Sequence, residues 1–191
     1  MNLQLRPALV LFAALTAICG VLYPLATTGI GKVAFSDQVA GSIVERGGKP
    51  VGSLLIGQSF TSPKYFWGRP SATSPMANNG AGSGGSNQGP TNPALVDAVK
   101  ARIAALKEAD PTNVQAIPVD LVTASGSGLD PEISLAAALY QAPRIARVRA
   151  MPLAQVENLI AKVQKTAYIG FFGEARVNVL DLNLALDAMQ K

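Results

Sequence analysis

The hydropathy pattern of the chain begins with one uninterrupted apolar run. Residues 8–30 read ALVLFAALTAICGVLYPLATTGI, and no charged residue lies between Arg6 and Lys32. About 20 apolar residues are enough for a helix to cross a hydrocarbon core about 30 Å thick. Because a backbone in lipid must satisfy its own hydrogen bonds, the run predicts a membrane-spanning helix in spite of Gly20 and Pro24. Pro24 lies late in the run, where a kinked or frayed last turn costs least.

Two processing signals are alternatives to a permanent anchor. A cleaved signal peptide has a basic start, a shorter apolar core and small residues at the cleavage site. Arg6 supplies only the first of these, and Pro24 stands where a small residue is needed. A lipoprotein signal ending at Cys19 is disfavoured by the bulky Ile18 before it. We therefore expect an uncleaved anchor, whose orientation the flanking charges leave open.

Small residues recur on one side of the predicted span. Ala13, Ala17 and Gly20 follow one another at spacings of four and three. Small side chains at helical spacing let another transmembrane helix approach closely. The alternative is that they face lipid, where alanine is common.

Shorter segments with strand-like patterns follow the run. Residues 42–46 and 51–57 are predicted to pair as a hairpin, because Gly47 and Gly48 supply the positive φ of a tight turn. The apolar residues 54–56 predict a strand covered on both faces. Alternating residues predict further strands at 119–123 and 176–180.

Helical patterns dominate the second half of the chain. Asn92 followed by proline is typical of a helix start, and the apolar spacing extends this helix to about residue 108. Asp130 followed by proline predicts a second helix to about residue 141, and Pro143 predicts the start of a short third one.

Two more helices complete the predicted fold. They cover residues 152–165 and 182–189, the latter capped by Asp181. The elements do not alternate as regular βαβ units. The pattern therefore predicts an α+β fold, with one N-terminal transmembrane helix followed by a single mixed α+β soluble domain at residues 31–191.

Aromatic residues gather between the predicted hairpin and the first soluble helix. Phe60, Tyr65, Phe66 and Trp67 lie close together in the sequence. One interpretation is a surface that stacks on nucleic-acid bases or a ligand. We favour the other, an aromatic plug that closes the core beneath a loop.

The aromatic residues are followed by a neutral loop at residues 71–92. It carries no charge and is rich in Gly, Asn and Ser. This composition is typical of a mobile linker. Its neutrality also suits a loop that lies against a partner.

Composition excludes several classes of function. The net charge is +4, but Lys and Arg are scattered singly, whereas a nucleic-acid surface needs a dense basic stripe. The chain has no histidine, so the commonest proton shuttle and transition-metal ligand are both missing. Its one cysteine, Cys19, lies within the apolar run, which excludes a disulfide framework or a cysteine metal site in the soluble part. We expect no bound metal and no nucleic acid.

A glycine-rich turn at residues 125–130 is the most ligand-like motif. Backbone N–H groups of such a turn at a helix start can hold a phosphate. The GK[ST] ending of a phosphate-binding loop is absent, so a capped turn is the favoured alternative. The candidate contact residues are Ser125, Gly126, Ser127, Gly128 and Asp130.

The remaining polar side chains do not assemble into a catalytic pattern. A serine hydrolase lacks its histidine base, and no lysine stands near the glycine-rich turn in sequence to replace it. The soluble acids stand singly, mostly at helix ends, where they cap helices or offset the helix dipole. Arg144, Arg147 and Arg149 could contact an acidic surface, but a solvated helix face is the favoured interpretation.

Several motifs in order resemble one known family. They are Tyr23-Pro24 at the end of the span, LIGQ-x-F at 55–60, YF-x-GRPSA at 65–72, SGGSN at 83–87, PVDLVTASGSGLDP at 118–131, Gln141-x-Pro143-Arg144, and NVLDLNLALD at 178–187. On these motifs the chain resembles, over essentially its whole length, the C subunit of the Kdp-type potassium-transporting ATPase of bacteria.

The resemblance implies an accessory subunit that is not itself an enzyme. In that family a potassium-translocating subunit, a P-type ATPase subunit and a small single-span subunit are the partners, and ATP and potassium act in the assembled complex. The C subunit is a single-pass protein of the inner membrane, with residues 1–7 cytoplasmic and the folded domain extracytoplasmic. It is described as a catalytic chaperone that raises the ATP affinity of the ATPase subunit.

This topology implies that the effect on ATP is indirect, because an outer domain cannot reach cytoplasmic nucleotide. Direct nucleotide binding by the glycine-rich turn is the alternative. We expect no cofactor held by this chain itself. The expected partner contacts are Tyr65, Phe66, Arg69, Ser83, Gly84, Gly85, Ser86 and Asn87.

Overall fold

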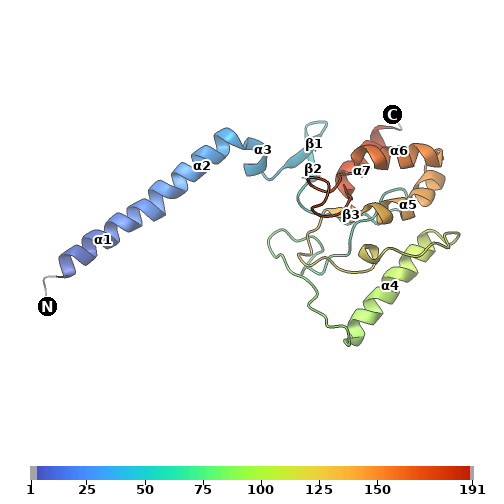
Figure 1. Ribbon diagram of the computed structural model, residues 1–191, viewed down its shortest axis with the longest axis horizontal. Helices are drawn as coiled ribbons and strands as arrows, with labels where there is room; N and C mark the ends of the chain where they lie inside the picture. Colours follow the sequence, from blue (N-terminus) through green and yellow to red (C-terminus); the bar gives the residue numbers. More distant parts are fainter. Residues whose placement is uncertain (1–3, 190–191) are drawn as a thin grey trace. The chain divides into compact units, whose positions relative to one another are not determined.

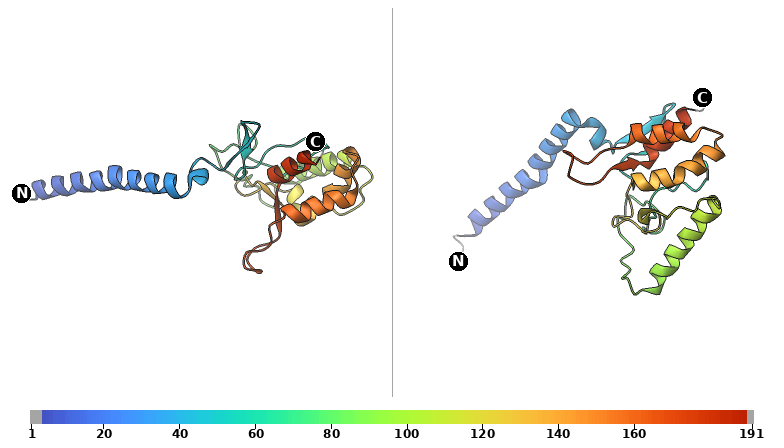
Figure 2. Two further views of the ribbon diagram at one scale, coloured as in Figure 1. Left: turned by 90° about the horizontal axis from the view of Figure 1, so that it is seen from above. Right: turned by 45° about the vertical axis from the view of Figure 1, so that its right-hand side comes forward.

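The computed structural model describes residues 4–189, which form two units (Figure 1). The amino-terminal unit ends at Ile43, and the larger unit begins at Val44. The larger unit contains most of the helices (Figures 1 and 2). It also contains every buried residue in the described part of the chain.

The amino-terminal unit is dominated by one long helix. It consists of α1 (Leu5–Ala17), the π-helical segment η1 (Ile18–Leu22) and α2 (Tyr23–Ala34). It has 30 residues, and an 18-residue window within it has a mean hydropathy of 2.2. Among the described residues it is the one helix long and apolar enough to cross a membrane. It includes the predicted residues 8–30 and extends beyond them at both ends.

The helix continues through Pro24, where the sequence predicted a kinked or frayed last turn. Proline has no N–H, and its ring crowds the carbonyl four residues earlier, here that of Gly20. The wider π turn η1 lies immediately before Pro24, at the place where that crowding arises. The Thr27 hydroxyl donates to the carbonyls of Tyr23 at 3.0 Å and Pro24 at 3.1 Å.

A short helix and a hairpin follow the long helix. α3 (Ser36–Val39) precedes β1 (Ile43–Arg46) and β2 (Lys49–Ser53), which pair as predicted. Gly47 and Gly48 have φ of 60° and 73°, as a primed turn requires. The expected strand over 54–56 is wrong, because β2 ends at Ser53 and the side chain of Leu55 is 60% exposed.

α4 (Pro93–Ala109) agrees with the predicted helix. Its cap is Asn92, whose side-chain oxygen accepts from the Ala94 amide at 3.0 Å. The strand expected at residues 119–123 is wrong. The 3₁₀ turn η2 (Val119–Leu121) takes its place, because its buried residue Leu121 meets the core while Val119 faces solvent.

The helix expected directly after Asp130 starts later. β3 (Glu132–Ser134) comes first, and α5 (Leu135–Val148) is capped by Ser134, whose hydroxyl oxygen accepts from the Ala137 amide at 3.0 Å. Pro143 lies inside α5 and does not begin a new helix. Local signals favoured a helix start at Asp130, but pairing of β3 with a distant strand prevails.

The partner of β3 is β4 (Arg176–Asn178), which pairs antiparallel to it with Ile133 opposite Val177. β4 is shorter than the predicted strand, because α7 (Val179–Ala188) starts directly after it. The cap of α7 is Asn178 rather than the expected Asp181: the Asn178 side chain accepts from the Asp181 amide at 3.1 Å.

The core lies between α5, α7 and α6 (Leu153–Val163), with the β3–β4 pair and one turn of α4 against it. α6 agrees with its prediction. Helices that pack on the β3–β4 sheet, together with the second two-stranded sheet β1–β2, confirm the α+β class. The fully buried apolar residues of this core are Phe66, Ala137, Ala138, Ala142, Ile145, Val156, Ile160, Val177, Leu182 and Leu186.

Candidate functional site

The neutral loop, residues 71–92, is held by its own polar side chains. The Ser71 hydroxyl accepts from the Asn78 amide at 2.9 Å. The Thr73 hydroxyl donates to the Met76 carbonyl at 2.7 Å and accepts from the Asn79 amide at 3.0 Å. Short polar side chains that bond nearby backbone give a loop a defined conformation. The expectation of a linker without fixed contacts is therefore wrong for this segment.

The neutral loop lies against the glycine-rich turn, residues 125–130. The Gly84 amide donates to the Ser127 carbonyl at 2.8 Å, and the Ser83 hydroxyl donates to the same oxygen at 3.1 Å. A Cβ on Gly85 would lie 2.9 Å from the Gly126 carbonyl oxygen. Gly128 has φ +66°, and its Cβ would lie 2.6 Å from the Gly84 oxygen. The contact therefore requires glycine on both sides.

The part of the neutral loop that makes this contact also has an exposed surface, and this surface carries no charge. Ser83, Ser86 and Asn87 are exposed, and Gly84 and Gly85 are half-buried beneath them. These five residues thus lie together, as the sequence expectation of a partner surface requires. Contact of this surface with a partner stays a prediction.

The glycine-rich turn lacks the geometry of a phosphate cradle. The amides of Gly128 and Leu129 already donate to Ser125 and Ser127 within the turn, at 3.3 and 3.1 Å. The segment that follows is β3, so no helix dipole points at the turn. Asp130 accepts from the Glu132 amide at 3.0 Å and pairs with Arg69 at 2.9 Å.

A pocket of about 320 Å³ lies beside Asp130 and is predominantly acidic. Of its two arginines, Arg69 pairs with Asp130 and Arg176 pairs with Glu132 at 2.7 Å. The lining carboxylates Asp120 and Glu174 are not paired with either arginine. A polyphosphate entering this pocket would therefore meet net negative charge, which opposes its binding.

The aromatic segment, residues 65–69, is fixed to the core by two amide side chains. Asn183 accepts from the Phe66 amide at 2.9 Å and donates to its carbonyl at 3.0 Å. Gln141 does the same for Trp67, at 2.8 and 3.1 Å. Each amide side chain thus bonds to the N–H and the C=O of one backbone residue, as a neighbouring strand would. Buried backbone groups need such hydrogen-bond partners.

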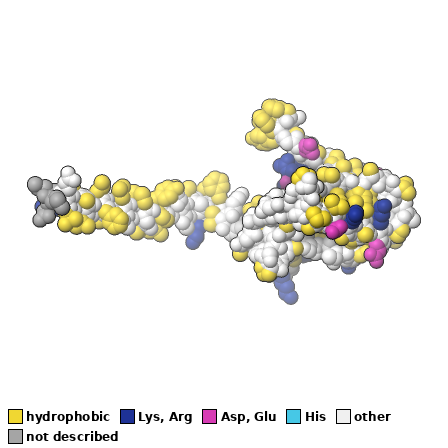
Figure 3. Space-filling view, turned by 90° about the horizontal axis from the view of Figure 1, so that it is seen from below, with side chains coloured by type: hydrophobic (Ala, Val, Ile, Leu, Met, Phe, Trp, Pro, Cys, Tyr) yellow, Lys and Arg dark blue, Asp and Glu magenta, His cyan; other side chains and the backbone are white. Residues whose placement is uncertain are grey.

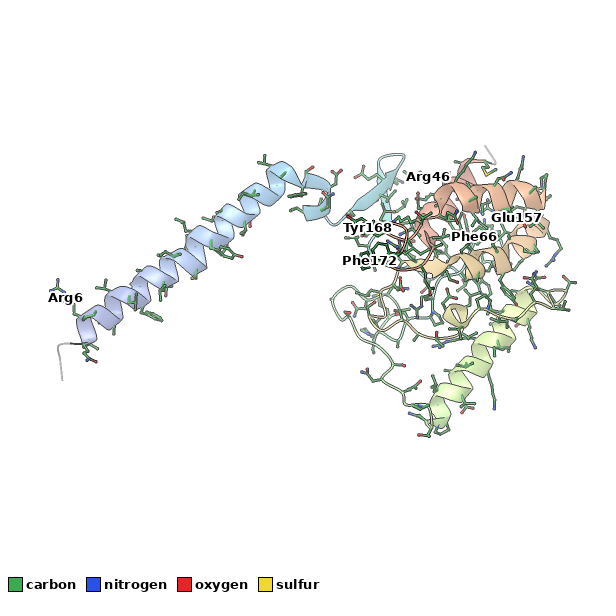
Figure 4. The ribbon with its side chains drawn as sticks, viewed as in Figure 1. Arg6, Arg46, Phe66, Glu157, Tyr168 and Phe172 are labelled. Carbon is green, nitrogen blue, oxygen red and sulfur yellow. The ribbon has the colours of Figure 1, made fainter. Side chains whose placement is uncertain are left out.

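The side chains of the segment divide between core and surface. Phe66, labelled in Figure 4, is fully buried, so the expectation that it contacts a partner is wrong and it supports the segment from inside. This agrees with the aromatic plug that the sequence favoured. Tyr65 and Arg69 are half-buried and keep atoms at the surface. They remain predicted partner contacts.

Arg144 is buried beneath the aromatic segment, contrary to the solvated face expected for it. The residue is 2% exposed, and its guanidinium donates to the carbonyls of Pro63 and Tyr65 and to Gln141. It also lies 4.9 Å from the centre of the Trp67 ring. Burial lowers the pKa of Arg144 to about 10. The planar guanidinium, with its several donors, suits this set of carbonyls.

The other two arginines also contact the protein itself. Arg147 pairs with the buried Asp110 at 2.8 Å and remains half-exposed. Arg149 pairs with Asp187 at 2.8 Å and lies over the Tyr65 ring. Tyr65 and Arg46 donate to the second oxygen of Asp187, each at 3.1 Å. The expectation of a solvated face is wrong for Arg149 as well, because its side chain is 5% exposed.

All six sequence motifs beyond the span meet in this assembly. The links are Gly57 to Leu129, Asn178 to Leu54, Gln141 to Trp67, Asn183 to Phe66, Arg69 to Asp130 and Gly84 to Ser127. The motifs therefore hold the segments 54–69, 83–87 and 125–130 together. Sequence reasoning missed Gln141 and Asn183 as supports, although a polar residue on an otherwise apolar helix face was the available signal.

The small residues of the span lie on its exposed surface. Ala13 and Ala17 belong to α1, whereas Gly20 belongs to the π segment. A Cβ on Gly20 would meet nothing within 4 Å. Because a π turn changes the angular spacing, Gly20 departs from the helical line through the two alanines. Packing of these residues on another span stays a prediction.

Comparison with known proteins identifies the family. A family profile described as "KdpC: K+-transporting ATPase, c chain" matches residues 5–188. Proteins named potassium-transporting ATPase KdpC subunit are 70% identical in Herminiimonas arsenicoxydans and 67% in Janthinobacterium sp. (strain Marseille). The alignments cover 98% of this chain and 98% and 99% of those relatives. A third relative, from Dechloromonas aromatica, is 59% identical over 100% of both chains. The resemblance carried by the motifs is thereby confirmed, and the chain belongs to the KdpC family, the c chain of the K+-transporting ATPase.

Proposed function

We propose that this chain is a non-catalytic accessory subunit that docks on the potassium-translocating subunit and stabilises the assembled pump. Its exposed docking surface is the neutral loop with the surface atoms of Tyr65 and Arg69. ATP hydrolysis belongs to the P-type ATPase subunit. The small single-span subunit and the bilayer complete its surroundings.

One observation carries this proposal: three polar residues of the family motifs fix the surface segment that carries Tyr65. Gln141, Asn183 and Arg144 all bond to the backbone of residues 63–67. A rigid scaffold beneath a surface loop is typical of recognition. A neutral surface is also desolvated on docking without the cost of burying unpaired charge.

The proposed influence on ATP affinity is indirect. Carbonyls of the glycine-rich turn accept hydrogen bonds from the neutral loop, and an acidic pocket lies beside the turn. Direct nucleotide contact at Ser125, Gly126, Ser127, Gly128 or Asp130 therefore gains no support from this geometry. Coupling through the membrane subunits is typically worth about 1–3 kcal/mol, which is about 5- to 150-fold in ATP affinity.

The proposed location is the bacterial inner membrane, with the long helix as a single span. In this proposal the domain is extracytoplasmic and residues 1–7 are cytoplasmic. This topology follows from the family resemblance, and the apolar helix Leu5–Ala34 supplies the anchor that it needs.

A charge placed on the neutral loop tests the docking role. The Met76 side chain is 63% exposed, and only its backbone bonds within the loop. Met76→Glu should therefore leave the fold intact, yet reduce co-purification of the complex and raise the KM for ATP. Val114→Glu is the matched control, because Val114 is 96% exposed on another loop. Unchanged assembly and ATPase kinetics in Met76→Glu and in a second variant, Ser86→Arg, would remove the loop from the proposal.

Labelling at Ser127 tests the topology separately. Ser127 is exposed on the glycine-rich turn, and Cys19 can be replaced by alanine so that no other thiol remains. Ser127→Cys should react with a membrane-impermeant maleimide in intact cells. Protection until the cells are opened would place the turn in the cytoplasm and favour direct nucleotide contact.

A further inference from the structure

Residues 165–176 form a two-stranded arm that projects from the domain between α6 and β4 (Figure 2). Lys165 and Arg176 exchange two backbone hydrogen bonds at its base, of 2.8 and 3.0 Å. Tyr168 and Phe172 exchange two more near its tip, of 2.8 and 2.9 Å. Paired backbone therefore holds the arm together from base to tip.

The tip of the arm is apolar and exposed. Tyr168, Ile169, Phe171 and Phe172 are 71%, 69%, 70% and 57% exposed. Figure 3 shows hydrophobic side chains gathered at the end of this projection, and Figure 4 labels Tyr168 and Phe172 there. The rings of Phe171 and Phe172 contact each other, with their centres 4.2 Å apart, but the tip side chains lie outside the domain core.

The turn at the tip uses an unusual residue. Ile169 and Gly170 have φ of 53° and 81°, which is the conformation of a primed turn. Asn-Gly is the preferred pair in such turns, and a β-branched residue is strongly disfavoured at positive φ. Isoleucine therefore does not help the turn to form. What it supplies at this position is an exposed apolar side chain.

Charges are confined to the ends of the arm. At the base, Glu132 pairs with Lys165 at 3.1 Å and with Arg176 at 2.7 Å. Between these two basic residues Glu174 is the one charged residue in the sequence. The base is thus anchored to β3 by ion pairs, and the tip can leave water without burying a charge.

We propose that the tip of the arm inserts into the interfacial layer of a lipid bilayer. The chain carries a helix apolar enough to span a membrane, and that helix ends at Ala34. Nine residues lie between Ala34 and Val44, where the folded domain begins, so at most about 35 Å of chain tethers the domain. A tethered domain meets its bilayer at high effective concentration.

The chemistry of the tip fits lipid. Aromatic side chains concentrate at membrane interfaces, where a tyrosine hydroxyl remains in the wet layer while apolar rings enter the acyl boundary. A narrow projecting tip can enter a fluid layer without a shaped receptor. The inference goes beyond the proposed docking role and does not depend on the neutral loop.

Fluorescence quenching in vesicles tests the proposal. The full chain, with Cys19→Ala, is reconstituted alone in vesicles of phosphatidylethanolamine and phosphatidylglycerol, and Ile169→Cys carries an environment-sensitive dye. Lipids with nitroxide groups near the head of the acyl chain should quench this dye at least about twofold more than a dye at Val114→Cys. Equal quenching at the two positions would overturn the proposal. Phe171→Cys provides a second reporter should the turn not tolerate the first.

Photo-crosslinking distinguishes lipid from a protein partner. A photoreactive benzoylphenylalanine at Phe171, in the assembled complex in membranes, should form adducts with lipid. Adducts with another subunit and none with lipid would show that the tip docks on protein and would reject the bilayer as its partner. Because Phe171 is exposed, the replacement leaves the core untouched.

Discussion

The Gly84 amide donates a 2.8 Å hydrogen bond to the Ser127 carbonyl, which joins the neutral loop to the glycine-rich turn. The composition of the neutral loop is typical of a flexible linker, and that of the turn is typical of a ligand site. In the structure these two segments bind to each other. The consequence is a loop surface with a defined conformation. Four positions in the domain, and one pair of positions in the span, give testable predictions.

Gly128→Ala should disrupt the joint between loop and turn. The residue has φ +66°, and an added Cβ would lie 2.5 Å from a Thr73 methyl and 2.6 Å from the Gly84 oxygen. We expect the free energy of unfolding of the full chain in detergent to fall by about 2–3 kcal/mol. Gly126→Ala is the matched control, since a Cβ there meets nothing within 4 Å. Similar losses in the two variants would contradict the packing described for the turn.

Asn183→Ala should loosen the aromatic segment. The change leaves the buried amide and carbonyl of Phe66 without partners. Each unsatisfied buried group costs about 1–3 kcal/mol, so a loss of about 2–6 kcal/mol is expected in urea unfolding. The exposed Gln155→Ala serves as control and should stay within about 0.5 kcal/mol of the parent. A loss no larger than that of the control would show that water replaces Asn183 without cost.

Arg144→Met should destabilise the same segment from below. Methionine fills part of the volume but leaves the carbonyls of Pro63 and Tyr65 without a donor. We expect a loss of about 3 kcal/mol, measured by thermal unfolding of the full chain. Arg144→Lys should recover only part of it, because one ammonium cannot reproduce the planar set of donors. Full recovery by lysine would indicate that charge alone matters at this position.

Asp187 should make the domain sensitive to acid. Burial by itself raises the pKa of Asp187, but hydrogen bonds from Arg149 and Tyr65 outweigh burial and lower the pKa below 3.8. A lowered pKa means that the carboxylate stabilises the fold above 3.8 and that this contribution is lost as the pH falls through the lower folded value. The difference in unfolding free energy between parent and Asp187→Asn should thus be largest near neutrality and shrink below about pH 4. A difference independent of pH would contradict this role.

Replacing Ala17 and Gly20 together by leucine should weaken assembly. Both residues are exposed on the long helix, and larger side chains there would hinder close approach by another span. The expected result is a lower yield of the complex on co-purification, while the chain still reaches the membrane. Leu11→Ile, on the same helix, is a volume-conserving control. Normal assembly of the double variant would indicate that these positions face lipid.

Local signals predicted much of the secondary structure. The apolar run, the Gly47–Gly48 turn and the Asn92 cap each act within a few residues, and each appears in the structure as an element. Local signals failed at Asp130, where β3 replaces a helix start because it pairs with β4 more than forty residues later. They failed again at Pro143, which remains inside α5.

The sequence by itself determined the membrane-length helix, the α+β class and the family, because hydropathy, turn chemistry and motif order are properties of neighbouring residues. Only the tertiary structure decided what the polar motif residues do. Gln141 and Arg144 bond to each other, but these two residues and Asn183 also bond to backbone groups more than seventy residues away. Such contacts form only when the core brings distant segments together. A polar group that is buried there needs a hydrogen-bond partner, because leaving it unpaired costs stability.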